Sequence, residues 1–95
     1  MTTPGEWDYK RFIEPLEGRM IRAIWRVTRD ADTAEEVLQQ ALIRIWDHFA
    51  QIREHANPEA FVLRLCLNAA HDHLRRTRRR ERRERLWQRL RPGNA

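Results

Sequence analysis

The stretch FVLRLCLNAAHDHLRRTRRRERRER, residues 61–85, decides the fold, because an apolar segment runs into arginines with no proline or glycine between them. Residues 60–70 are apolar nearly all round, which is typical of a helix enclosed by its neighbours. From about Arg75 the pattern becomes cationic, and these positions are not expected to be buried. The sequence therefore predicts one helix with an enclosed first half. For the basic second half, continuation to about Leu90 and fraying are both open alternatives.

The charge of the chain is unevenly divided. Residues 75–91 hold ten arginines and two glutamates, whereas residues 1–74 hold nine Lys or Arg and twelve Asp or Glu. Arginine stays charged at cellular pH, and its planar fork matches phosphate groups. The run indicates an anionic partner, with a phosphate backbone as the first candidate. A solvated basic tail that keeps a small domain soluble explains the run equally well.

The length and composition limit the class of protein. Ninety-five residues suffice for one domain with a core but leave no room for a separate cofactor-binding lobe. No apolar run approaches the ~20 residues that cross a bilayer, and no secretory signal is visible, so we expect no membrane insertion. The single cysteine, Cys66, is expected to be a small core residue. These features indicate a cytoplasmic protein.

Two further helical segments precede the arginine-rich one. In the first, Pro15 lies inside the apolar pattern, so the helix either begins near Pro15 or kinks there. Its apolar residues recur at steps of three and four: Phe12, Ile13, Leu16, Met20, Ile21, Ile24 and Val27.

The second helix is expected to begin at a capping box, in which the Thr33 hydroxyl accepts a hydrogen bond from the backbone N–H of Glu36. Asn57 and Pro58 mark the start of the third helix. The apolar face of the second helix extends to residue 52 and comprises Ala34, Leu38, Ala41, Leu42, Ile45, Phe49 and Ile52. The predicted fold class is all-α: a compact bundle of three helices, or four with a kinked first helix, and a long basic C-terminal helix.

Another side of the second helix lies outside this core face. An aliphatic and an aromatic residue within a polar strip are typical of a surface that docks a partner helix. An ordinary solvent face, with Trp46 folded back into the core, is the alternative on periodicity alone. The strip consists of Glu36, Gln39, Gln40 and Ile43, and Trp46 continues it.

Asn68 is the one polar residue that interrupts the apolar run of residues 65–70. A buried amide without a partner costs about 1–3 kcal/mol, so Asn68 must bond inside the fold or reach the surface. An internal bond, for example to the loop near Arg53, is one alternative. Contact with the edge of a base is the other, because an amide presents a donor and an acceptor together.

Two blocks of the sequence resemble extracytoplasmic-function sigma factors of the sigma-70 family. AEEVLQQALIRIW at 34–46 resembles the helix written AEDLVQEVFLRAW in that family. AFVLRLCLNAAHDHLRR at 60–76 resembles AWLYRIARNLALDHLRR without a gap, and Arg64, Asn68 and residues 72–76 are identical to it. The blocks have the right order and separation. With a weaker likeness over residues 9–24, they cover most of residues 9–80.

The resemblance implies a region 2 domain over residues 1–91, which binds core RNA polymerase and recognises and helps melt the promoter −10 element. The loop at residues 53–57 would form the wall of a pocket for a flipped base. The residues expected to dock on the clamp helices of the largest polymerase subunit are Glu36, Gln39, Gln40 and Ile43. The residues expected to bind DNA are Arg53, Arg64, Asn68, Arg75, Arg76, Arg79 and Arg80.

The chain departs from the family pattern in several places. Gln40 stands where a second carboxylate is usual, Phe61 where tryptophan is usual, and Leu67 where a basic residue often precedes the asparagine. Residues 92–95 look like the start of an interdomain linker, and the family's region 4 is absent. We therefore expect an isolated region 2 of a longer protein.

The resemblance implies neither an enzyme nor a cofactor, because a sigma factor catalyses no covalent step, and we expect no metal site. An anti-sigma factor is an expected further partner. Two other interpretations are a general nucleic-acid-binding helical module and a sigma-like adaptor that binds only an anti-sigma protein. The apolar residues beyond the arginines would dock back on the domain, anchor a second domain or contact an anti-sigma protein; they are Leu86, Trp87 and Leu90.

Overall fold

The structure is a computed structural model that describes residues 4–93, with side chains described from residue 9 onward. Within this range every regular element is helical, so the all-α prediction is confirmed. The elements in chain order are α1 (Pro4–Ile13), the short 3-10 helix η1 (Glu14–Leu16), α2 (Glu17–Thr28), α3 (Ala31–Asp47), α4 (Phe49–Glu54) and α5 (Pro58–Leu90).

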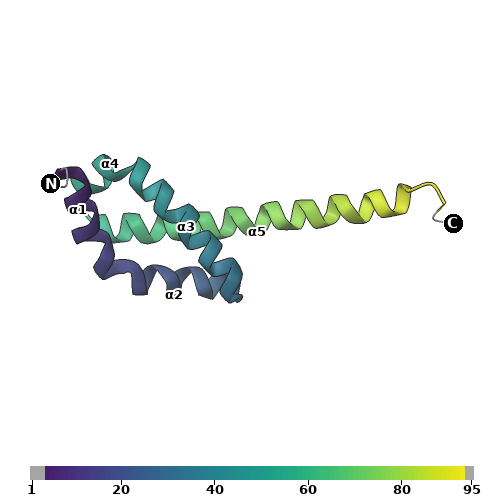
Figure 1. Cartoon of the computed structure of the whole chain (residues 1–95), viewed down its shortest axis with the longest axis horizontal. Coiled ribbons are helices and arrows are strands. Elements are labelled where there is room, and N and C mark those ends of the chain that lie inside the picture. Colours follow the sequence, from purple (N-terminus) through teal and green to yellow (C-terminus); the bar gives the residue numbers. More distant parts are fainter. Residues whose placement is uncertain (1–3, 94–95) are drawn as a thin grey trace.

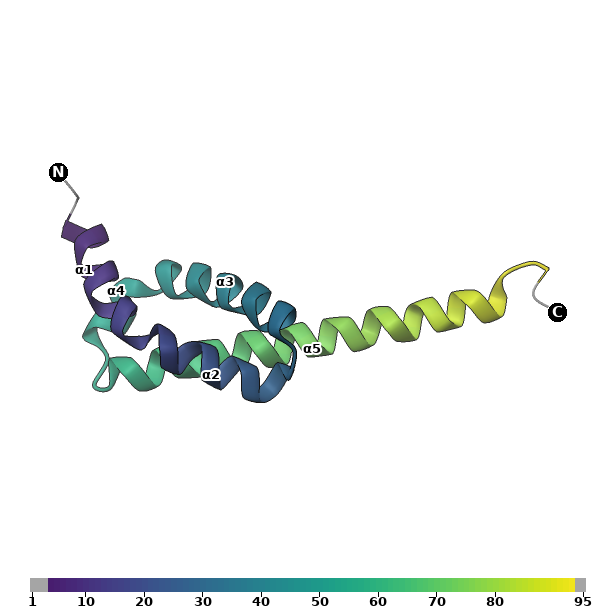
Figure 2. The ribbon, with the colours of Figure 1, turned by 60° about the horizontal axis from the view of Figure 1, so that its bottom comes forward.

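The bundle is formed by α2, α3 and the first half of α5, which pack against one another. Figures 1 and 2 show α1 and α4 at the end of the bundle where α5 begins, while the second half of α5 projects alone. The 33 residues of α5 span roughly 50 Å at ~1.5 Å per residue. This helix therefore accounts for most of the molecule's 63 Å length, against 25 and 24 Å in the other directions.

The core lies between the three bundle helices. Cys66 is fully buried, as predicted, and burial raises the pKa of its thiol to about 12. All residues from 78 to 93 are exposed, so the enclosed part of α5 ends before its arginine-rich half. This half is helical to Leu90, so continuation is confirmed over fraying. The largest fully buried side chains are Ile13, Met20, Ile24, Val37, Ile45, Ile52, Val62 and Cys66.

The first helical segment is broken around Pro15. α1 ends at Ile13, Pro15 lies in η1, and α2 begins at Glu17. The alternative of a helix beginning near Pro15 is wrong, because α1 precedes it, and the predicted kink is confirmed. The break turns the chain so that both Ile13 and Met20 reach the core.

The predicted capping box at Thr33 is wrong, because α3 begins earlier. Asp30 is the N-cap: its Oδ2 accepts hydrogen bonds from the backbone N–H of Thr33 at 2.8 Å and from the Thr33 hydroxyl at 2.6 Å. Arg29 is left-handed, with φ 55°, and Asp30 is extended, with φ −145°, so the chain turns sharply enough for this carboxylate to reach. These two bonds lower the pKa of Asp30.

The second predicted helix is divided at His48 into α3 and α4. The Nδ1 atom of the His48 ring lies 2.8 Å from the carbonyl oxygen of Arg44, and this oxygen also accepts the His48 backbone N–H at 3.1 Å. Phe49 and Ile52 remain buried beyond the break, so the apolar spacing gave no sign of it. The predicted start of the third helix is confirmed, because Asn57 Oδ1 accepts a hydrogen bond from the Ala60 N–H at 3.2 Å.

Across the part of the chain that is described, no helix combines the length and the apolar character needed to cross a membrane.

Candidate functional site

The outer side of α3 presents the predicted docking strip. Glu36 and Gln39 are exposed, Gln40 is half-buried, and 64% of the Ile43 surface is exposed. Trp46 is 49% exposed, so the alternative in which it folds into the core is wrong. Its ring instead meets the Tyr9 ring edge-on, with centroids 4.9 Å apart. The strip therefore combines polar side chains with two large apolar groups in contact with solvent.

Tyr9 connects α1 to this region. Its hydroxyl donates to the carbonyl oxygen of Leu42 at 3.3 Å, and its ring also meets Phe49 at a centroid distance of 5.4 Å. Burial raises the pKa of Tyr9, and Glu17 and Cys66 raise it further. The ring of Tyr9 thus contacts the Trp46 indole, and about half of the Trp46 surface stays exposed.

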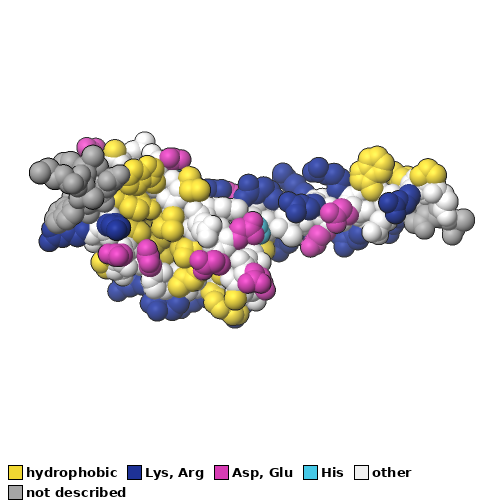
Figure 3. Space-filling view, viewed as in Figure 1, with side chains coloured by type: hydrophobic (Ala, Val, Ile, Leu, Met, Phe, Trp, Pro, Cys, Tyr) yellow, Lys and Arg dark blue, Asp and Glu magenta, His cyan; other side chains and the backbone are white. Residues whose placement is uncertain are grey.

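One side of α5 gathers four of the predicted DNA-binding residues. Arg64, Asn68, Arg75 and Arg79 follow one another at steps of four, seven and four residues, so they share a side of the helix, and all four are exposed. Within residues 9–93 no group bonds the Asn68 amide, so the alternative of an internal bond is wrong. Figure 3 shows dark blue side chains along the projecting half of α5.

The other predicted DNA-binding residues lie elsewhere. Arg76 turns toward α3, where its Nη2 donates to Gln40 Oε1 at 3.5 Å. Arg80 lies about 100° around α5 from Arg79, so it leaves the Asn68 side. Arg53 belongs to the last turn of α4, and the loop before α5 is shorter than predicted, spanning residues 55–57.

Asp72 joins the two candidate surfaces. Its Oδ2 pairs with Arg44 Nη1 of α3 at 3.1 Å, and its Oδ1 pairs with Arg75 one turn further along α5. Hydrogen bonds from Arg75 and Arg44 lower the pKa of Asp72, so the carboxylate stays charged at neutral pH. Arg75 is consequently oriented by a group that is itself tied to α3.

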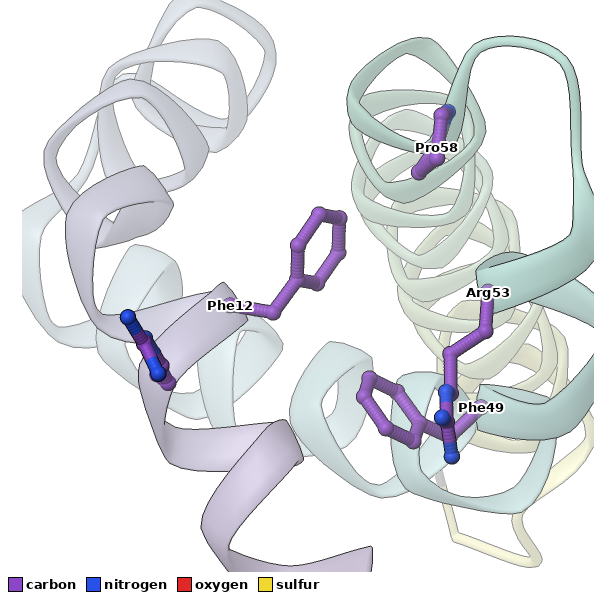
Figure 4. Close-up of a pocket in the computed structure, with 5 residues that line it drawn as sticks. Phe12, Phe49, Arg53 and Pro58 are labelled. Carbon is purple, nitrogen blue, oxygen red and sulfur yellow. The ribbon is translucent and has the colours of Figure 1, made fainter.

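A pocket of about 430 Å³ opens where α1, α4 and the start of α5 meet. Its lining residues are Arg11, Phe12, Phe49, Arg53 and Pro58. In Figure 4, Phe12 reaches in from α1, and Phe49, Arg53 and Pro58 face it from α4 and α5. The Arg53 guanidinium carbon lies 5.9 Å from the centroid of the Phe49 ring. The pocket therefore offers aromatic faces beside a cation.

Arg53, which the family resemblance places in the wall of a base pocket, lines this pocket, and Arg11 and Phe12 line it without having been predicted. Phe12 was assigned to the core stripe, and nothing in the local pattern indicates that the break at Pro15 carries α1 across to α4. The short loop before α5 is held by the Asn57 N–H, which donates to His55 Nδ1 at 3.0 Å, and by the edge-on contact of His55 with Phe61 at a centroid distance of 5.0 Å. None of residues 55–57 lines the pocket. Among the described residues no group of three or more His, Cys, Asp or Glu side chains could hold a metal ion.

Comparison with known families identifies the class of this domain. The family Sigma-70 region 2 matches residues 12–80, and the chain therefore belongs to this family. Sigma factors act in transcription initiation through RNA polymerase and promoter DNA, and the family is non-catalytic. No curated protein and no solved structure matched the chain.

Proposed function

We propose that this domain acts as region 2 of an extracytoplasmic-function sigma factor, binding core RNA polymerase through α3 and recognising and helping to melt the −10 element through α5. The observation that carries the proposal is the exposed, unbonded Asn68 within residues 9–93, on the same side of α5 as Arg64, Arg75 and Arg79. A polar residue within an otherwise apolar stretch, left without an internal partner, favours a role in binding over a role in packing.

Docking on the polymerase clamp helices would use Glu36, Gln39, Gln40 and Ile43. Ile43 and the free part of Trp46 supply apolar surface, and aromatic and aliphatic anchors of this kind dominate interface energies. The polar residues around them set the register of the partner helix. Gln40 would contact polymerase while its Oε1 accepts the hydrogen bond from Arg76.

Recognition of the −10 element requires a base to leave the duplex, at a cost of a few kcal/mol. The pocket between α1 and α4 would receive that base, because stacking on an aromatic ring contributes about 1–3 kcal/mol per base and Arg53 adds a donor at the rim. Arg64, Arg75, Arg76 and Arg79 would hold the strand's phosphates, with Arg80 in reach of a flanking phosphate. Asn68 would read a base edge, the one contact of the set that carries sequence choice.

The same proposal assigns residues 1–91 to the region 2 unit and 92–95 to the start of a linker toward another domain. The place of action would be the cytoplasm, where polymerase and promoter are found. An anti-sigma factor would be the regulatory partner, binding where it blocks the α3 strip.

A double substitution on α3 tests the docking. Glu36→Arg with Gln39→Ala should abolish capture of core RNA polymerase, because it reverses one charge and removes a polar contact in the centre of the strip. Both positions are exposed, so the free energy of unfolding should change by no more than about 0.5 kcal/mol. Glu14→Arg is the matched control, since Glu14 is an exposed glutamate that lies in η1, outside α3. Polymerase capture by the double variant at the level of the control would refute the docking surface.

A further inference from the structure

α2 carries a row of arginines that none of the surfaces described above includes. Three of the four residues follow one another at steps of three and four, so they share one side of the helix; the fourth is the C-cap directly after α2, and all four are exposed. Glu17 is the one acidic residue in α2. The row consists of Arg19, Arg22, Arg26 and Arg29.

This arginine row borders the DNA-binding side of α5. A hollow of about 290 Å³ is lined by Arg19, Arg22, Ala23 and Arg26 of α2 and by Leu63 of α5. Leu63 directly precedes Arg64, and the partly exposed Leu67, one turn further, directly precedes Asn68. Figure 3 shows dark blue side chains along α2 as well as along α5. Leu63 lies about 100° around α5 from Arg64, so the two basic surfaces lie on adjoining sides of this helix.

Among the described side chains, the two central arginines of the row have no acidic partner. Arg19 pairs with Glu59 at the start of α5, and Arg29 lies over the Trp25 ring at 5.6 Å. For Arg22 and Arg26, no carboxylate within residues 9–93 forms an ion pair. Like charges four residues apart destabilise a helix, so the stability of α2 does not explain this pair.

We propose that the arginine row is a second phosphate-binding surface, which holds the backbone of the nucleic acid that α5 engages; this rests on the proposed function. From Arg19 to Arg29 the row spans roughly 15 Å of helix axis, at ~1.5 Å per residue. That length equals about four nucleotide steps of B-form DNA at ~3.4 Å each. The guanidinium fork suits phosphate oxygens, and such contacts add affinity without sequence choice.

Nucleic acid fits this surface better than the other anionic or self-associating partners. An acidic protein would need to cross from the α2 row onto the basic side of α5, whereas a phosphate backbone runs along both surfaces without interruption. A second copy of this chain, with a net charge of +5, would bring like charges together. The ligand chemistry is thus a run of phosphates, supplied by a single strand or by the neighbouring duplex.

Salt-dependent binding of the full chain to labelled DNA tests the proposal. The probes are a single-stranded −10 oligonucleotide, a duplex of the flanking sequence and scrambled versions of both, measured by fluorescence anisotropy over a range of NaCl concentrations. The test variant is Arg22→Ala with Arg26→Ala. The matched control, Ala31→Glu with Gln51→Glu, lowers the net charge by the same two units at exposed positions on α3 and α4. Arg22→Lys with Arg26→Lys retains both charges.

The alanine variant should flatten the slope of log K against log salt by about 1.4 on the single strand, or by about 1.8 on the duplex, and the probe affected identifies the source of the phosphates. The lysine variant should keep the slope, and the preference for the −10 sequence should survive in both. Slopes in the alanine variant equal to those of the charge-matched control would overturn the second surface alone. If the alanine variant has the same slopes as the charge-matched control but binds a polyglutamate probe more weakly, the arginine row would instead be assigned to an acidic protein partner. No preference for the −10 strand in the unaltered chain would instead overturn the proposed −10 recognition.

Discussion

Asn68 occupies the exposed side of α5 within the half of the helix that the bundle encloses. Its neighbours Ala69 and Ala70 are fully buried, so the backbone at Asn68 is fixed by packing while its amide meets solvent. A contact group on a rigid helix is positioned more accurately than one on a loop. The base contact that we propose for Asn68 would therefore depend on the burial of the next residue, Ala69.

Replacement of Asn68 by alanine tests this role. Because the amide is exposed and has no partner in residues 9–93, Asn68→Ala should leave the melting temperature within a few degrees and should preserve polymerase capture. Transcription should fall, and the penalty should depend on which base occupies one −10 position. An equal loss on all −10 variants, or a clear loss of stability, would return Asn68 to a structural role.

Cys66 is the residue whose chemistry the fold suppresses. The thiolate is the reactive form, and raising the pKa from 9.0 to about 12 lowers the thiolate fraction about a thousandfold at neutral pH. A thiol reagent at pH 8 should therefore label the native chain far more slowly than the chain in denaturant. Rapid labelling of the native chain would show that α5 opens easily from the bundle. The sign of the shift also means that stability should fall as the pH rises from about 9 toward 12.

α5 is the element that divides most clearly into two parts. Its buried residues Val62, Cys66, Ala69 and Ala70 all lie in the first half. Leu86, Trp87 and Leu90 are exposed, and Trp87 is 70% exposed, so the alternative in which they dock back on the domain is wrong. Figure 3 shows them as a yellow patch near the far end of the helix. Residues 78–90 of α5 therefore add no buried residue to the bundle.

Removal of residues 77–95 tests this division. The thermal transition should be retained, because the fully buried residues end at Ala70 and, within the described residues 77–93, only Thr77 is even half-buried. Binding to all DNA sequences should weaken alike, and the salt dependence should flatten by roughly 0.7 of a log–log unit for each single-strand phosphate that the shortened chain no longer binds. Trp87→Ala in the full chain is the control for the apolar patch and should leave stability unchanged. Loss of the transition on truncation would place the patch in the core.

At the scale of the whole molecule, the features that were predicted correctly are ones that depend on neighbouring residues in the chain. Helix content, the Asn57 cap, the enclosed half of α5 and the burial of Cys66 follow from patterns within about ten residues, and these predictions are confirmed. The predicted start of α3 was too late, because the aspartate three positions before Thr33 accepts the Thr33 backbone N–H and becomes the cap. The sequence did not predict the break at His48, because the apolar spacing continues across it.

Features that depend on distant segments were not predictable from one sequence. The bond of Arg76 to Gln40 joins residues 36 apart, and the pocket joins Phe12 to Phe49 and Pro58. The bond depends on the packing of α3 against α5, and the pocket depends on the meeting of α1, α4 and the start of α5. The spacing of the arginines on α2 is visible in the sequence, but the phosphate-binding role that we propose for them depends on their position beside Leu63 of α5.

The central claim is that one small bundle presents a polymerase surface on α3 and a −10 surface on α5. The most direct measurement is capture of core RNA polymerase on immobilised −10 strand in the presence of the chain. The account predicts capture that requires the chain and the −10 sequence, and that is lost with Glu36→Arg plus Gln39→Ala although that variant still binds the strand. Capture that is independent of the chain, equal on a scrambled strand, or retained by the double variant would contradict it.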